Sequence, residues 1–140
     1  MWTRTYSQVV KDVSADRLWR AWTDVDQWPC WQDDVEHAKL EGEFAAGRFF
    51  RFKPKGGPDL RIELSEVLPG RRFVDITRFP LARMVDAHEI TEHPDGVEVK
   101  TTLSMHGPLA FVWRKLVGEG VAAGLPQQTQ RLVEWARASG

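Results

Sequence analysis

The sequence has only one cysteine and no excess of either charge. Cys30 cannot form a disulfide within the chain, so we expect a buried or inert thiol and a reducing, cytoplasmic location. The 19 Lys and Arg residues and the 20 Asp and Glu residues are interspersed and give a formal net charge of −1. Because nucleic acids and anionic membranes attract strongly basic surfaces, this balance predicts neither as a partner.

Long hydrophobic runs and processing signals are also lacking. No segment approaches the roughly 18 apolar residues of a membrane-spanning helix, so we expect no integral membrane association. The N-terminal stretch MWTRTYSQVV has neither the apolar core nor the cleavage site of a signal peptide. No internal repeat is present. With 42% hydrophobic and 28% charged residues among 140, the composition predicts a single domain over residues 1–140.

Large aromatic residues are abundant. Seven Trp and seven Phe supply more aromatic surface than a minimal core of this size needs. Such surface lines pockets for flat or apolar ligands, but it can equally fill a Trp-rich core. The composition alone leaves both interpretations open.

The N-terminal part of the chain predicts one strand and two short helices. Residues 3–12 mix β-branched and polar residues, as is typical of an edge strand. Ser14 can cap a helix whose apolar residues follow a 3.6-residue period and which ends near Thr23. The next segment, DVDQWPCWQDDVE, contains a proline that permits only a short second helical turn.

Six further strands are expected between Val35 and His106. The segments are EHAKLEG, RFFRFKP, LRIELSEVLPG, RFVDITRF, RMVDAHEITEHPDG and VEVKTTLSMHG. In the turn sequences PKGGP (54–58), PG and PDG, proline presets φ and glycine accepts a positive φ. The pattern predicts an antiparallel meander and, together with the helices, an α+β fold.

A long C-terminal helix is expected over Pro108–Ala138. Proline is favourable at the first helical position, and apolar residues then recur at steps of three and four, which predicts one apolar face. Glycines at 118, 120 and 124 and Pro126 interrupt this pattern. We therefore expect a kink or a break near Leu125-Pro126.

Strand alternation predicts which side chains face that helix. The inward sets of the last two strands are Met84, Asp86, His88 and Ile90, and Val97, Val99, Thr101, Leu103 and Met105. On the third strand Phe50 and Phe52 are expected inside.

The strand over 71–79 is ambiguous, because either of its two faces could be the inner one. One face carries Phe73, Asp75, Thr77 and Phe79, and the other carries Val74, Ile76 and Arg78. We favour the first set. Asp86 and His88 are then buried polar groups that need partners, because an unpaired buried polar group costs about 1–3 kcal/mol.

The order of a strand, two short helices, six strands and a long helix resembles the polyketide cyclase and dehydrase-like branch of the START-like (SRPBCC) superfamily. The resemblance spans essentially the whole chain. It rests on the spacing within WTDVDQWPCW (22–31), on the turn EFAAG (43–47) and on Gly107-Pro108-Leu109 before the last helix. It implies a Bet v 1-like helix-grip fold: a curved seven-stranded antiparallel sheet with two short helices and a long C-terminal helix enclosing a cavity.

Members of that superfamily bind lipids, sterols, polyketides or other apolar molecules, and some are cyclases. The resemblance therefore implies ligand binding and leaves catalysis open. In a cyclase, a base would remove an acidic C–H proton between two carbonyls and promote aldol closure and loss of water.

The sequence offers one candidate for such chemistry. The four histidines, His37, His88, His93 and His106, are scattered, so we expect no metal and no cofactor. No nucleophile motif is present. His88 faces inward and titrates near neutrality, so it is the candidate acid or base, with Asp86 or Asp75 to orient it. The alternative is a histidine that only lines the core.

The main hypothesis is that the protein binds a small hydrophobic molecule between the sheet and the C-terminal helix. The candidate ligand contacts are Trp28, Trp31, Phe52, Phe73, Thr77, Met84, His88, Met105, Trp113 and Leu116. A cyclase or dehydratase, and an interaction domain with a filled core, are the alternatives. We expect a monomer or dimer, with the 54–58 loop and the glycines of 120–126 as candidate gates.

Overall fold

A curved antiparallel sheet of seven strands forms the main layer of the structure, a computed structural model that describes residues 2–139. The strands are β1 (Trp2–Val10), β2 (Val35–Glu41), β3 (Phe49–Pro54), β4 (Leu60–Leu68), β5 (Arg72–Phe79), β6 (Ala82–His93) and β7 (Gly96–His106). Their order is β1-β7-β6-β5-β4-β3-β2. The predicted meander of six strands is confirmed, and the structure adds the first strand, β1, beside the last, β7.

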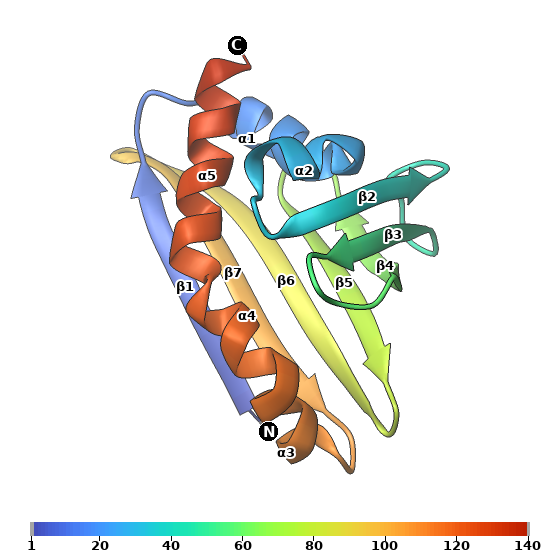
Figure 1. The fold of residues 1–140 in the computed structure, drawn as a ribbon. Coiled ribbons are helices and arrows are strands. Elements are labelled where there is room, and N and C mark those ends of the chain that lie inside the picture. Colours follow the sequence, from blue (N-terminus) through green and yellow to red (C-terminus); the bar gives the residue numbers. More distant parts are fainter. Residues whose placement is uncertain (1, 140) are drawn as a thin grey trace.

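Register shifts bend the sheet toward its helical side. The pairing of β2 with β3 shifts between Val35 and His37, and that of β4 with β5 shifts between Leu64 and Glu66. An extra residue at such a bulge bends the strand and increases its twist. In Figure 1, β2 and β3 accordingly cross the direction of β6 and β7, and the helices lie in the concave side.

Two short helical segments close one end of that concave side. Ser14 caps α1 (Ala15–Thr23) as predicted, because its hydroxyl accepts a hydrogen bond of 3.1 Å from the amide of Arg17. A 3₁₀ turn, η1 (Val25–Gln27), leads to α2 (Trp28–Trp31). The indole of Trp28 donates to the carbonyl of Trp22 at 3.2 Å, which ties the two helices together.

The C-terminal helix is divided into four parts. They are α3 (Ala110–Trp113), the π-helical turn η2 (Arg114–Gly118), α4 (Glu119–Ala123) and α5 (Leu125–Ala138). The helix is interrupted at Gly124, whose amide donates to the carbonyls of Gly120 and Val121. Pro126 lies in the first turn of α5, where its missing N–H costs nothing. Of the two predicted outcomes, kink or break, the structure has the break.

The predicted start of this helix is two residues too early. The helix begins at Ala110, because Gly107 has a φ of +108° and Leu109 has a ψ of 22°, both outside the helical range. The amide of Leu109 donates to the carbonyl of Leu81 in the β5–β6 turn at 3.0 Å. Pro108 therefore belongs to the connection from β7 and not to the helix.

Two groups of apolar side chains fill the space between sheet and helices. The main core lies under α1, α2 and α5 and includes Leu18, Trp22, Phe50, Phe73 and Leu132. A second cluster lies under α3, η2 and α4. Its buried members are Trp2, Met84, Leu103 and Met105, and its half-buried members include Phe79, Trp113, Val117 and Val121.

Gly118 sets how closely η2 approaches the second cluster. A Cβ atom at Gly118 would lie 3.0 Å from the indole of Trp2 and 3.2 Å from the methyl group of Met105, whereas one at Gly120 would meet nothing within 4 Å. We therefore expect Gly118→Val to lower the free energy of unfolding by about 1–3 kcal/mol through overpacking. The matched variant Gly120→Val should change it by less than about 0.5 kcal/mol in urea unfolding. Equal effects of the two variants would contradict this packing.

Candidate functional site

Polar side chains interrupt the apolar interior at the middle of three adjacent strands, β5, β6 and β7. They are Asp75 and Thr77 on β5, Asp86 and His88 on β6, and Thr101 on β7, and we call these five residues the polar band. Asp75 pairs across the sheet with Asp86, and His88 pairs with Thr101. Phe73 and Ile90 precede the band on the side of the main core, and Phe79 and Met84 follow it in the second cluster.

Side-chain burial shows which face of the 71–79 strand is the inner one. Phe73, Asp75 and Thr77 are buried, with 0%, 6% and 3% of their surfaces exposed, and Arg78 on the other face is exposed. The favoured inward set is therefore the one observed. Phe50 is buried and Phe52 half-buried on the same side, while Phe49 lies outside under the guanidinium of Arg61, 3.9 Å from its ring centre.

His88 lies at the centre of the polar band and is held on all sides. Its Nε2 is 3.1 Å from Oδ2 of Asp75 and 3.4 Å from Oδ1 of Asp86. The ring stacks on Phe73 at 4.2 Å between centres, and Trp22 meets it edge-on at 5.0 Å. Since the aromatic contacts fix the plane of the imidazole and the carboxylates fix one of its nitrogens, the ring has a single orientation.

Burial and mutual contact shift the proton equilibria of this group. Burial raises the pKa of Asp86 from 3.8 to about 7, helped by the nearby Asp75 and opposed by His88. Burial by itself would lower the pKa of His88, but the carboxylates of Asp86 and Asp75 outweigh it and raise that pKa above its ordinary value. Near neutral pH the group can therefore hold or release a proton.

Two atoms of the group have no hydrogen-bond partner among the described residues. They are Nδ1 of His88 and Oδ1 of Asp86, and both are buried. When Nε2–H of the neutral ring donates to Asp75, Nδ1 is left as a free acceptor. A carboxylate fixes the tautomer of a general base in this way. The geometry can thus hold a polar group of a ligand or move a proton, once the packing opens enough to admit one.

Asp75, Asp86 and His88 carry oxygen and nitrogen atoms of the kinds that bind metal ions. One nitrogen of His88 and one oxygen from each of Asp75 and Asp86 lie within 4.8 Å of one another. A histidine that ligates a metal normally donates its other ring N–H to a fixed acceptor, and Nδ1 of His88 has none within residues 2–139. The scattered spacing of the histidines did not indicate this cluster; the signal was the Asp-x-His pair on one strand face opposite Asp75.

The structure divides the candidate ligand contacts between the two apolar groups. Trp28, Trp31, Phe52 and Phe73 pack in or against the main core, where aromatic rings contact one another directly. Met84, Met105 and Trp113 belong to the second cluster, and Thr77 and His88 to the polar band. The sequence could not separate these groups, because the same strand alternation applies to both.

Two expectations are wrong. Leu116 is 69% exposed, because it lies on the outer side of η2 while Trp113 and Val117 contact the second cluster. For Cys30, of the expected buried or inert thiol, the buried state is wrong: the thiol is exposed, because both tryptophans of α2 lie on the inner side. Its Sγ donates to Oε1 of Gln27 at 3.4 Å.

The second cluster contains contacts that the sequence did not indicate. Phe79 stacks on Trp113 with 4.6 Å between ring centres, and the indole N–H of Trp113 donates to the carbonyl of Pro80 at 2.9 Å. None of the residues of α3 or α4 is fully buried. This half of the interior is therefore covered less tightly than the half under α5, which has five buried residues.

A comparison with family models identifies the family. The model described as polyketide cyclase / dehydrase and lipid transport matches residues 1–136. The protein therefore belongs to this family, and the resemblance inferred from its sequence is confirmed. No match was found among curated proteins. No helix in the described part of the chain is long and apolar enough to cross a membrane.

Solved structures share the fold. Protein MLL2253 from Mesorhizobium loti is 20% identical, with a TM-score of 0.76 and 99% of each chain covered. Ara h 8.0201 is 12% identical, with a TM-score of 0.73 and coverage of 98% of this chain and 99% of that one. The di-domain ARO/CYC StfQ from the steffimycin biosynthetic pathway is 15% identical, with a TM-score of 0.72 and coverage of 97% and 49%. These similarities establish a Bet v 1-like α+β fold.

The raised pKa of Asp86 makes the stability pH-dependent. Because the folded protein keeps a proton that the unfolded chain releases above pH 3.8, the free energy of unfolding falls as the pH rises toward 7. His88 acts in the same direction, since stability present below pH 6.5 is lost as the pH rises through its raised folded pKa.

We expect Asp86→Asn to remove the part of this dependence that comes from Asp86. Relative to the native protein, the variant should gain more than about 1 kcal/mol in free energy of unfolding between about pH 5 and pH 8. Urea unfolding at the two pH values measures the gain. Asp59→Asn, in an exposed turn, is the control and should gain nothing. A difference between Asp86→Asn and the native protein that does not vary with pH would contradict the assigned shift.

Proposed function

We propose that the protein binds a small, mainly apolar molecule with at least one polar group, in the half of the interior covered by α3, η2 and α4. The observation that carries this proposal is the loose cover of the second cluster. Phe79, Trp113, Val117 and Val121 contact the cluster yet remain only half-buried, and large apolar side chains in that position gain free energy when a ligand removes them from water.

The polar band supports the same location. It lies where the main core ends and the second cluster begins, so a molecule in the second cluster would meet it at one end only. Oδ1 of Asp86 and Nδ1 of His88 could then receive hydrogen bonds that they otherwise lack. These surroundings favour a ligand with an apolar body, which would lie beside the second cluster, and a hydrogen-bond donor, which would face the polar band.

The break at Gly124 supports a route for the ligand. It separates α5, which packs on the main core, from α3, η2 and α4, which pack on the second cluster. The segment 120–126 can therefore act as the hinge of a gate that moves without disturbing the main core. The exposed 54–58 turn remains a second candidate gate.

One alternative, an interaction domain with a filled interior, fits the main core but not the second cluster. Trp28, Trp31 and Phe73 are buried in the main core, where Trp28 and Phe73 make edge-on aromatic contacts, as expected of an interaction domain with a filled interior. The second cluster differs, because no residue of α3 or α4 above it is fully buried. We therefore place the ligand beside Met84, Met105 and Trp113, and no longer beside Trp28 and Trp31.

Filling the second cluster tests the binding site. Val121 on α4 is half-buried against the cluster, and Ala123 on the same helix is exposed. Val121→Trp should weaken binding of the apolar fluorescent probe anilinonaphthalene sulfonate at least about tenfold, by occupying the volume the ligand needs. Ala123→Trp should leave it unchanged. Equal affinities of the two variants would place the binding site elsewhere.

A second candidate function is acid–base catalysis of the cyclase or dehydratase kind at His88. The contact of Nε2 with Asp75 and the free Nδ1 favour it. Its test uses the small molecule that native mass spectrometry finds bound to the protein purified from its own host. His88→Gln should lower turnover of that molecule about 10²-fold or more and leave its binding within about threefold. Unchanged turnover would leave binding as the function.

A further inference from the structure

The first helical turn of the C-terminal region, α3, consists of apolar residues on all sides but lies at the surface. Residues 109–117 read LAFVWRKLV, and α3 consists of four apolar residues, none of which is buried. A helix that is hydrophobic all round is normally enclosed by protein or by lipid. Packing against the sheet accounts for Trp113 and Val117 and leaves the outer side without a partner among the described residues.

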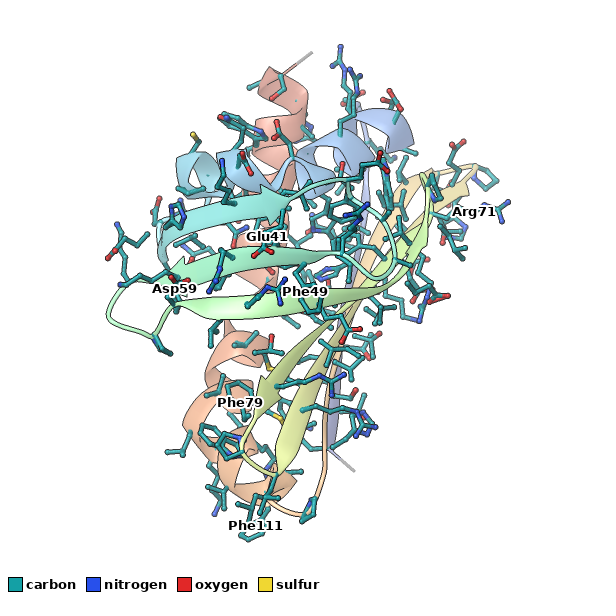
Figure 2. The ribbon with its side chains drawn as sticks, turned by 90° about the vertical axis from the view of Figure 1, so that its right-hand side faces the viewer. Glu41, Phe49, Asp59, Arg71, Phe79 and Phe111 are labelled. Atoms are coloured by element: carbon teal, nitrogen blue, oxygen red, sulfur yellow. The ribbon has the colours of Figure 1, made fainter. Side chains whose placement is uncertain are left out.

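Exposed apolar side chains gather at this end of the molecule. Leu81, Phe111 and Leu116 are 65%, 62% and 69% exposed, and we call them the apolar tip. Leu81 lies in the β5–β6 turn, which is bound to the helical segment through the Leu109 amide and the Trp113 indole. Figure 2 shows Phe111 at the extreme end of the molecule, beyond Phe79 and pointing away from the sheet. Single exposed apolar side chains need no explanation, but two leucines and a phenylalanine at one end define a surface.

Basic side chains surround the apolar tip. The segments 77–85 and 105–118 contain Arg78, Arg83, Arg114 and Lys115 and no acidic residue, in a chain whose net charge is −1. Arg78 pairs with Glu63 and Arg114 with Glu119, whereas Arg83 and Lys115 have no carboxylate partner within residues 2–139. Arg4 and Arg114 line a surface depression beside Phe111. The rim can therefore face anions such as lipid phosphates.

We propose that the apolar tip and its basic rim are a membrane-docking surface, which places Leu81, Phe111 and Leu116 in the interfacial layer of a bilayer that contains anionic lipids. Lysine and arginine at such a boundary keep their charges at the headgroups while their stems lie along apolar surface. The charge of the rim favours this partner over a second copy of the chain, because a symmetric contact through the tip would bring Arg83 and Lys115 of each copy together without a compensating carboxylate.

The docking surface also adjoins the half of the interior that is loosely covered. Trp113 stacks on Phe79 inside, while Phe111 and Leu116 of the same segment point outward. Docking would thus bring α3 and η2 into the bilayer and the second cluster next to it. The docking surface does not require the proposed ligand site, and the two can be tested separately.

Vesicle co-sedimentation tests the proposal with the full chain. We expect binding to vesicles of phosphatidylcholine and phosphatidylglycerol in about equal parts, weak binding to phosphatidylcholine alone, and a loss of binding as salt is raised. The double variant Phe111→Ser/Leu116→Ser and the double variant Arg83→Glu/Lys115→Glu should each lower vesicle affinity at least about tenfold. All these positions are exposed, so folding should be retained.

The matched control changes exposed apolar residues away from the tip. Val9 and Leu68 are 49% and 47% exposed, and Val9→Ser/Leu68→Ser should bind vesicles like the native protein. Val121→Trp should also keep vesicle binding, even when it loses the apolar probe. The proposal is overturned if the native protein binds neither vesicle type, if the control loses as much affinity as the tip variants, or if the tip variants abolish a dimer in sedimentation velocity without changing vesicle binding.

Discussion

The burial of His88 between two carboxylates in an otherwise apolar interior is the constraint on which the account depends. Placing polar groups at the middle of three adjacent strands divides the interior in two, since neither apolar group can extend through them. The aromatic contacts of Phe73 and Trp22 hold the imidazole from the side of the main core. Interior positions that could have held apolar side chains instead hold ionisable ones, which costs stability unless they are paired.

The two halves of the interior differ because the C-terminal helix is broken. Downstream of Gly124, α5 packs on the main core in the usual way, with one apolar face inside and a polar face outside. Upstream, a π-helical turn interrupts the α-helix, Gly118 lets η2 approach Trp2 and Met105 closely, and α3 and α4 have no fully buried residue. The part of the helix with buried residues on the main core, α5, and the parts without a fully buried residue, α3 and α4, are thus separate segments, which Figure 1 shows one after the other along the helix.

The sequence predicts much of the fold because local signals there agree with one another. Ser14, the turn glycines and prolines, and strand alternation indicate the right elements, and alternation alone brings Asp75, Asp86 and His88 to the inner face. It does not predict that aromatic rings would close half of the interior, because packing density is a property of the assembled layers. Leu116 and Cys30 were misplaced because helix phase changes in a π-helical turn, and because Trp28 and Trp31 occupy the inner side of a very short helix. The balanced net charge likewise concealed the basic rim, which only the folding together of two distant segments creates.

Methyl NMR of the two methionines beside the polar band tests the central claim most directly. Met84 and Met105 both lie in the second cluster, with 8% and 0% of their surfaces exposed, so their ¹³C-labelled methyl groups report on that half of the interior alone. The account predicts that a stoichiometric amount of a bound apolar molecule shifts both methyl resonances. If the molecule binds while both resonances stay unchanged, the ligand does not occupy the second cluster and the proposed site is wrong.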